Sequence, residues 1–206
     1  MNKDWSWARI SDTFDAHVRE QLPWYDTATT GVVHMVRAFL PNGGHVYDVG
    51  ASTGNIGNAI AATLTERAAD LTAIEPEPGM KYTGPGKLLR ERVETVSPAP
   101  HDVSVWMLTL MFIPPHERSV VLTKFWNALR PGGCMIGIDR VCRWPGSGEV
   151  ALAMERCSWT AKLDGGATAE AIVAKELQLS GIQRPIDHIP GDEWFRFGQF
   201  VGWVKT

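Results

Sequence analysis

The spacing of apolar residues along the chain predicts helices that alternate with short buried strands. Phe14, Val18 and Leu22 recur at every fourth position, which is typical of one face of an amphipathic helix. A second helical pattern runs over residues 32–40. Apolar runs of strand length then follow, as expected for strands that are covered on both faces of a sheet. The expected strands lie at 45–49, 70–75, 92–96, 103–110 and 134–139, with helices at 55–67 and 115–129.

The region after residue 140 predicts two further helices and a last strand. Residues 149–162 and 168–179 have helical patterns, and residues 195–205 are expected to form one strand antiparallel to its neighbour. Residues 87–92 form either a short helix or a solvated basic run. With right-handed crossovers assumed, this order of elements builds an α/β doubly wound sheet over a single core, with no second domain.

Composition narrows the classes of function. The chain has 206 residues, of which 44% are hydrophobic and 21% charged, so it suits one globular domain. A net charge of −3 shows no global basic character that would favour nucleic acid, although a local patch stays open. No apolar run has the length of a signal peptide or of a membrane span. Three cysteines without a CxxC motif favour a reducing compartment, so we expect a cytoplasmic protein: Cys134, Cys142 and Cys157.

A glycine-rich stretch over residues 48–57 is the strongest functional signal. Gly50 and Gly54 can take positive φ and let the backbone pass close to a small molecule, although an ordinary strand-to-helix turn also uses such glycines. Glu75 lies about 20 residues beyond the loop, where a carboxylate can accept both hydrogen bonds of a ribose diol. Glu75 could instead be a solvated acid of a loop. The glycine loop and Glu75 together favour a ligand site more than either does alone.

Three stretches of the chain resemble class I S-adenosylmethionine-dependent methyltransferases. They are Asp48-Val49-Gly50-Ala51-Ser52-Thr53-Gly54, Glu75 at the end of the second strand, and Leu129-Arg130-Pro131-Gly132-Gly133. Within that superfamily, residues 14–18, 109–118 and 195–198 resemble bacterial carboxy-S-adenosylmethionine synthases of the tRNA wobble-uridine pathway. The superfamily resemblance covers about residues 40–140, whereas the closer one is spread over most of the chain.

This resemblance implies a Rossmann-like, doubly wound, seven-stranded sheet, mostly parallel with one antiparallel C-terminal strand. It divides the single domain of residues 1–206 into N-terminal helices that cover the cleft (1–44), a cofactor-binding core (45–140), and C-terminal helices with the last strands (141–206). The implied cofactor is S-adenosyl-L-methionine, with its carboxylated form as the alternative. The implied cofactor-binding residues are Asp48, Gly50, Ala51, Ser52, Gly54, Glu75, Pro76, Met80, Met107, Leu108 and Thr109.

Departures from the synthase pattern favour plain S-adenosylmethionine. Asp102 or a backbone group has to replace the usual acid that binds the adenine amine. The synthase segment with the arginine that grips the extra carboxylate has no clear match, and Arg184 is the nearest candidate by position. Residues 29–31 stand where the synthases have Pro-Gly-Tyr.

Three functions therefore compete: a methyltransferase of unknown acceptor, a carboxy-S-adenosylmethionine synthase variant, and a binding module without catalysis. Methyl transfer needs mainly positioning, with a general base only for some acceptors. We assign no catalytic residue, and the candidate bases are His101, Asp102, His116, Asp139 and Tyr25.

The acceptor is expected to be a small molecule or a nucleotide. The synthase resemblance makes tRNA a candidate partner despite the absence of a basic stripe, and a homodimer is also open. No metal-ligand spacing is present, so we predict no metal. Aromatic residues in segments that cover the cleft either stack a base or close an apolar pocket: Trp5, Trp7, Trp24, Tyr25 and Trp144.

Overall fold

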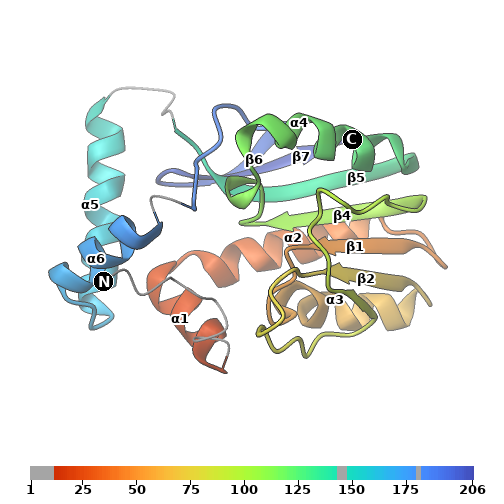
Figure 1. The fold of residues 1–206 in the computed structure, drawn as a ribbon, viewed down its shortest axis with the longest axis horizontal. Coiled ribbons are helices and arrows are strands. Elements are labelled where there is room, and N and C mark those ends of the chain that lie inside the picture. Colours follow the sequence, from red (N-terminus) through yellow and green to blue (C-terminus); the bar gives the residue numbers. More distant parts are fainter. Residues whose placement is uncertain (1–11, 143–147, 180–181) are drawn as a thin grey trace.

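The computed structural model describes residues 12–142, 148–179 and 182–206. They form a seven-stranded sheet with the strand order β3-β2-β1-β4-β5-β7-β6 and helices packed around it (Figure 1). The strands are β1 His45–Val49, β2 Asp70–Ile74, β3 Lys87–Leu89, β4 His101–Met107, β5 Leu129–Arg140, β6 Asp192–Phe197 and β7 Phe200–Lys205. The helices are α1 Phe14–Gln21, α2 Tyr25–Phe39, α3 Asn55–Glu66, α4 Pro115–Asn127, α5 Gly148–Asp164 and α6 Ala169–Leu179, with a 3-10 turn at Leu110–Phe112.

The sheet has the predicted direction of its strands. β1 pairs in parallel with both β2 and β4, so that Val46 lies opposite Leu71 on one side and Val103 on the other. β7 is antiparallel to β5 and to β6, which leaves β7 as the strand that runs against the others. The prediction of a mostly parallel seven-stranded sheet with one antiparallel C-terminal strand is therefore confirmed.

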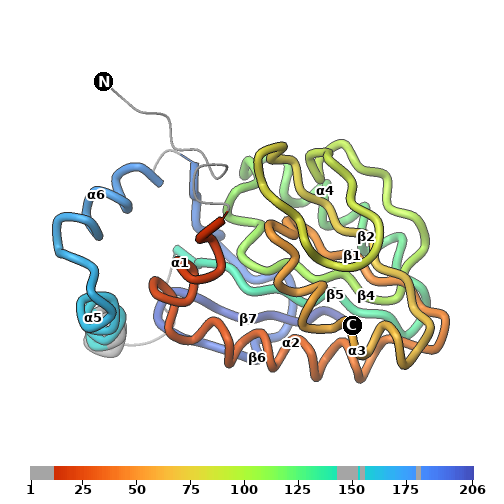
Figure 2. Tube along the Cα trace, turned by 90° about the horizontal axis from the view of Figure 1, so that it is seen from below, coloured from red at the N-terminus to blue at the C-terminus, as the bar shows by residue number. Residues whose placement is uncertain are grey.

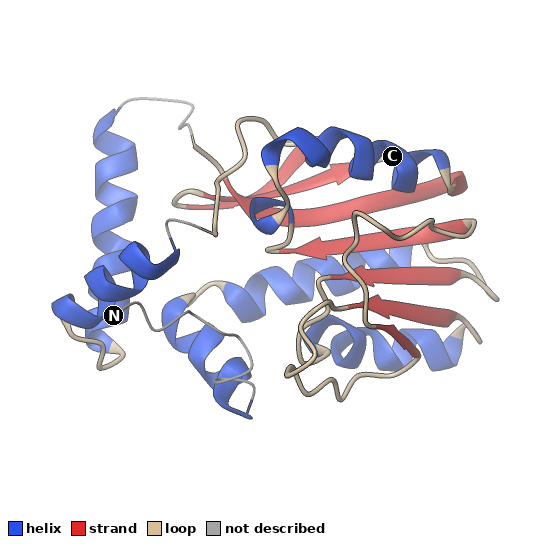
Figure 3. Cartoon of the chain, in the orientation of Figure 1, coloured by secondary structure: helices blue, strands red, loops and turns tan. Residues whose placement is uncertain are grey.

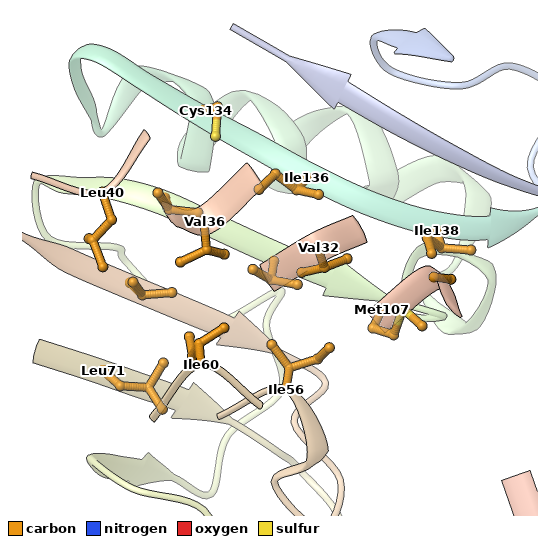
Figure 4. Packing of buried hydrophobic residues seen from close by; sticks show 14 of the residues in the cluster. Val32, Val36, Leu40, Ile56, Ile60, Leu71, Met107, Cys134, Ile136 and Ile138 are labelled. Atoms are coloured by element: carbon orange, nitrogen blue, oxygen red, sulfur yellow. The ribbon is translucent and has the colours of Figure 1, made fainter. Parts of the chain in front are cut away.

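Apolar side chains fill both faces of the sheet. On one face, α2 and α3 pack Val32, Val36 and Ile60 against β-strand residues such as Ile136 (Figure 4). On the other face, Phe125 of α4 lies in a second cluster with strand residues of the sheet. All seven residues of β4 are buried because helices cover it on both sides. This double cover explains why the strands appear in the sequence as continuous apolar runs.

Two expected strands are wrong in detail. The third strand is not at 92–96 but at β3, where Lys87–Leu89, expected as a short helix or a solvated basic run, pairs with β2 as the edge strand of the sheet. Val93 and Val96 are buried in a turn, so their alternation comes from packing and not from a strand. The single strand expected at 195–205 is a hairpin, since Gly198 has a φ of +59° and reverses the chain between β6 and β7.

The helices α1, α5 and α6 lie at the end of the molecule toward which the parallel strands point (Figures 1 and 2). The cartoon of strands and helices shows the same arrangement, with the arrowheads of the parallel strands β1, β2 and β4 directed toward α1 and α6 (Figure 3). Ligands of open α/β sheets bind outside the carboxyl ends of the strands, where neighbouring connections leave in opposite directions. Here that point lies between β1 and β4.

Within the described ranges, no helix combines the length and the apolar character that a membrane span requires. The described residues also contain no group of three or more His, Cys, Asp or Glu side chains arranged to hold a metal ion.

Candidate functional site

A cavity of about 610 Å³ lies at the carboxyl ends of β1, β2, β4 and β5. Its volume is in the range of small-molecule sites. One side, here called the glycine-loop wall, consists of residues 48–56, 74–80 and 107–109 that line the cavity. The other side, here called the helical wall, consists of Arg140, Ser158, Trp159, Lys162, Lys175, Glu176, Leu179 and Gln183.

The glycine loop follows β1 in a conformation that needs glycine at two positions. Gly50 has a φ of +76°, and a Cβ there would lie 2.5 Å from Oγ1 of Thr109. Gly54, the N-cap of α3, has a φ of +97°, and a Cβ there would lie 2.5 Å from the backbone nitrogen of Gly84. Side chains would therefore meet both left-handed strain and a collision at these positions.

Ten of the eleven predicted cofactor residues line the cavity, all of them in the glycine-loop wall. The exception is Gly54, which lies behind the loop and shapes it without lining the cavity. The lining residues are Asp48, Gly50, Ala51, Ser52, Glu75, Pro76, Met80, Met107, Leu108 and Thr109. The structure thus brings them together, while their contact with a cofactor stays a prediction.

Asp48 is the buried acid at the end of β1. It is 1% exposed, and its Oδ2 has no hydrogen-bond partner among the described residues. Burial raises the pKa of Asp48 to about 7, with a smaller rise from the negative charge of Glu75, while the N–H of Gly57 lowers it. An unpaired carboxylate oxygen in this position favours a cationic or hydrogen-bond-donating ligand.

Glu75 holds the loop from the end of β2. Its Oε2 accepts a hydrogen bond of 2.8 Å from the N–H of Ser52, and its Oε1 accepts one of 2.9 Å from the N–H of Glu77. Burial raises the pKa of Glu75, and the two backbone N–H groups oppose that rise. Because a carboxylate has about four acceptor sites, Glu75 keeps capacity for hydroxyl groups of a ligand.

The end of β4 closes the floor of the glycine-loop wall. Oγ1 of Thr109 donates a hydrogen bond of 2.6 Å to the carbonyl of Val49, which joins the ends of β1 and β4. Leu108 has a φ of +57°, and its N–H donates to the carbonyl of Ile138 at 2.7 Å. A non-glycine residue in this region of φ is held there by its surroundings and is frequent at functional sites.

Helix α1 lies against the glycine loop. Oδ1 of Asp15 accepts hydrogen bonds from Oγ1 of Thr53 at 2.6 Å and from Nδ2 of Asn55 at 2.8 Å. Phe14, Val18 and other α1 residues line the cavity. The N-terminal segment therefore contributes directly to the cavity that the parallel strands form.

Most of the candidate general bases lie away from the cavity. His101 is 0% exposed at the amino end of β4, packed against Tyr47 and Phe125. Asp102, also at that end, accepts the N–H of His45 at 2.8 Å and pairs with Arg130 at 2.6 Å.

His116 is exposed at the start of α4, and Asp139 is buried behind the cavity. Asp139 accepts hydrogen bonds from the N–H of Met111 at 3.2 Å and from Nε1 of Trp203 at 3.3 Å. Burial raises the pKa of Asp139 to about 7, although these donors oppose the rise.

Tyr25 is the one candidate base that lines the cavity. Burial, together with the negative charge of Asp48, raises the pKa of Tyr25 well above its ordinary value. The phenol therefore keeps its proton near neutral pH and acts there as a donor.

The helical wall was not found by the sequence analysis. Arg184, the expected carboxylate-gripping arginine, does not line the cavity; its N–H donates to the carbonyl of Met111 at 2.7 Å. Arg140 lines the cavity instead, because the end of β5 directs it there. In the sequence, Arg140 directly follows Asp139, which ends a predicted strand. This position was the only signal that could have identified Arg140 as a cavity residue.

The aromatic predictions are divided. Trp24 is buried and packs on Phe195 and Phe200, so it does not line the cavity, whereas Tyr25 does. Trp159 of α5 lines the cavity and was missed. Trp5, Trp7 and Trp144 lie outside the described residues.

The described residues fit S-adenosylmethionine. The unpaired oxygen of Asp48 suits the ammonium group of the methionine part, and Glu75 suits a ribose diol. The glycines of the loop have no side chain, so the loop backbone lies close to the space between Asp48 and Glu75.

No family model matches the chain. Among curated proteins, the chain is 23% identical over 220 residues to a carboxy-S-adenosyl-L-methionine synthase of Staphylococcus epidermidis, covering 96% of this chain and 94% of that protein. It is 28% identical to the protein of that name from Geobacter metallireducens and 29% identical to that from Chromohalobacter salexigens. These two matches cover 65% and 72% of this chain but only 59% and 58% of the relatives.

Solved structures with a similar fold include the plantazolicin methyltransferase BpumL in complex with S-adenosylhomocysteine. It has a TM-score of 0.57 and 16% identity, over 84% of this chain and 62% of that one. Human N-acetylserotonin methyltransferase in complex with S-adenosylmethionine has a TM-score of 0.53 and 10% identity, over 89% of this chain and 52% of that one. The chain has the Rossmann-like fold of the class I S-adenosylmethionine-dependent methyltransferases and resembles in sequence the carboxy-S-adenosyl-L-methionine synthases.

Proposed function

We propose that the protein is an S-adenosylmethionine-dependent methyltransferase. The observation that carries this proposal is the glycine-loop wall, where the unpaired Oδ2 of Asp48 and the carboxylate of Glu75 line one cavity at the strand ends. Both acids suit a ligand that carries a positive charge and a ribose. The relatives and the similar folds described above support the same class of ligand.

When bound, S-adenosylmethionine supplies a methyl group on a positively charged sulfur, ready for in-line displacement by a nucleophile. The chain's part is positioning and exclusion of water. Glu75 holds the loop through two backbone N–H groups, and Thr109 joins the ends of β1 and β4. Tyr25 offers a protonated hydroxyl and not a base.

A carboxy-S-adenosylmethionine synthase variant is the second candidate function. It is favoured by the relative from Staphylococcus epidermidis, which matches along 94% of its length, and by the presence of Arg140 in the cavity. Such an enzyme would work in tRNA modification, as the resemblance implies. Mass spectrometry of the ligand that co-purifies with the protein separates the two functions, because the carboxylated cofactor is heavier than S-adenosylmethionine.

A module that binds the cofactor without catalysis is the third reading. Incubation with methyl-labelled S-adenosylmethionine and a cell extract separates it from an enzyme. Transfer of label to an extract component supports a methyltransferase, whereas a cofactor that binds and is never consumed supports the module.

We also propose a cytoplasmic location. Support comes from Cys134 and Cys157, which are in no disulfide within the described part of the chain, since disulfides persist mainly in oxidising compartments.

Replacement of Glu75 tests the cofactor site directly. Glu75→Ala removes the acceptor of two backbone N–H groups and the proposed ribose ligand, so S-adenosylhomocysteine should bind roughly 30-fold more weakly in calorimetry. Glu66→Ala is the matched control, because Glu66 pairs with Arg37 on the surface and does not line the cavity. Equal affinity of the Glu75→Ala variant and the wild type would show that the cofactor assignment is wrong.

A further inference from the structure

The helical wall gathers positive charge inside the cavity. Arg140 comes from the end of β5, Lys162 from α5 and Lys175 from α6, and all three line the cavity. Among the described side chains of this wall, Glu176 is the only acid. None of these residues belongs to the glycine-loop wall. The helical wall therefore has an excess of positive charge that the acids of the glycine-loop wall do not pair with.

Arg140 is held in place by three polar neighbours. Its Nε donates to Oε1 of Gln199 at 2.7 Å, and its Nη1 donates to Oε2 of Glu176 at 3.0 Å and to Oε1 of Gln183 at 3.2 Å. These bonds use Nε and Nη1 only. The side chain is 23% exposed, and Nη2 has no described hydrogen-bond partner, so the N–H groups of Nη2 remain available to a ligand.

The two lysines share little negative charge. Nζ of Lys162 is 3.7 Å from Oε1 of Glu176, the same carboxylate that binds Arg140, and its side chain is 13% exposed. Nζ of Lys175 lies 2.8 Å from Nε2 of His17. When Nε2 accepts a hydrogen bond from the lysine, the imidazole is neutral and adds no negative charge. Three cations therefore share the carboxylate of Glu176, and Glu20 adds a second negative charge near Lys175.

The electrostatics of Lys175 agree with this excess. Burial, together with the positive charge of Lys162, lowers the pKa of Lys175 to about 8, although Glu176 and Glu20 oppose this shift. His17, its neighbour, has a lowered pKa because of burial and because of Lys175. The cluster destabilises its own charges, as expected where an anionic group completes a site.

We propose that the helical wall binds a carboxylate of the methyl acceptor, so that the acceptor is a small organic acid. The proposal rests on the proposed methyltransferase function and adds the class of its substrate. Nη2 of Arg140 can donate to a carboxylate oxygen, and the lysines supply further charge-assisted hydrogen bonds. Trp159 and Leu179 of the same wall offer apolar surface to the body of such an acid. A neutral acceptor would leave the excess positive charge of this partly buried wall uncompensated.

Calorimetry on the full chain saturated with S-adenosylhomocysteine tests the proposal. The probes are 3-phenylpropionate and its neutral amide, which differ only in the acid group. The bound S-adenosylhomocysteine carries no carboxylate on its sulfur. Any preference for the acid therefore comes from the probe and not from a carboxylated cofactor. We expect the acid to bind roughly tenfold more tightly than the amide, in line with the strength of charged hydrogen bonds.

Two variants and a control locate the effect. Lys162→Met should reduce the preference for the acid to about threefold, and Arg140→Gln should abolish it. Since Arg140→Gln also loses the bond to Glu176, the lysine variant keeps the test valid if the arginine variant does not fold. Lys87→Met removes an exposed lysine outside the cavity and should leave the preference unchanged.

The outcomes separate the two levels of the proposal. Equal binding of acid and amide, or binding of neither, by protein that holds S-adenosylhomocysteine overturns the acid site and leaves the methyltransferase proposal standing. An unchanged preference in the Lys162→Met and Arg140→Gln variants also overturns it. Failure of S-adenosylhomocysteine itself to bind overturns the proposed function.

Discussion

The two walls of the cavity differ in charge and in origin. The glycine-loop wall contains the buried acids Asp48 and Glu75, and the helical wall contains Arg140, Lys162 and Lys175. The first suits the positive sulfonium and ammonium groups of a cofactor, and the second suits an acid. Opposite charges on the two walls would thus hold two ligands of opposite charge beside each other, which is what group transfer between them requires.

The walls also differ in how they are built. The glycine-loop wall comes from turns that directly follow β1, β2 and β4, and its shape depends on backbone conformations such as that of Gly54. The helical wall comes from side chains far apart in sequence, such as Arg140 and Glu176, which are joined by a hydrogen bond of 3.0 Å. We therefore expect the first wall to be sensitive to backbone changes and the second to charge changes.

The largest effect is expected from Gly54→Ala. The new Cβ meets left-handed strain and the backbone of Gly84, so S-adenosylhomocysteine should bind roughly 100-fold more weakly in calorimetry. Gly43→Ala is the matched control, since Gly43 has a φ of +66° but nothing within 4 Å of a Cβ. Gly43→Ala should lose about 1–2 kcal/mol in the free energy of unfolding, measured with urea, and Gly54→Ala should lose more because its Cβ also collides with the backbone of Gly84. Equal cofactor affinity in the two variants would show that the backbone conformation at Gly54 does not shape the cofactor site.

A smaller effect is expected from pH. The pKa of Asp48 is about 7 in the free protein, and a bound ammonium group favours the ionised carboxylate. The affinity for S-adenosylhomocysteine should therefore fall roughly tenfold as the pH is lowered from 8 to 6. Asp48→Asn should bind more weakly at pH 8 and show a flat profile over this range. A wild-type profile that is already flat would mean that Asp48 does not face the ammonium group.

The smallest effect is expected at Asp139, the residue before Arg140. Its pKa of about 7 lies above the unfolded value near 3.8, so the folded state binds more protons between these values. The protonated acid favours the fold at low pH, and that advantage is lost as the pH rises through 7. From pH 6 to pH 8, Asp139→Asn should lose about 1 kcal/mol less than the wild type in its free energy of unfolding.

The same variant should bind S-adenosylhomocysteine as the wild type does, because Asp139 does not line the cavity. Asp48 and Asp139 are both buried acids near strand ends with similar pKa values. We expect only Asp48 to affect cofactor binding, because only Asp48 lines the cavity. A change in cofactor binding for Asp139→Asn would contradict this expectation.

Much of the sheet could be predicted from the sequence because its strands are covered on both faces. β1 was predicted with its bounds, since five apolar-rich residues lie between a proline-glycine stop and the glycine loop. The third strand failed because Val93 and Val96 imitate an alternating pattern while packing from a turn. β3 is a three-residue edge strand that depends on pairing with β2, and pairing leaves little local signal.

By itself, the sequence determined the glycine-loop wall, since the loop glycines, Asp48 and Glu75 each follow a strand and need only that strand to be placed. The tertiary structure alone decided that Gly54 lies behind the loop, that Arg140 and not Arg184 lines the cavity, and that α5 and α6 bring lysines to it. The physical reason is distance along the chain: a turn is encoded by its own residues, whereas side chains from separate elements meet only after the whole core has packed.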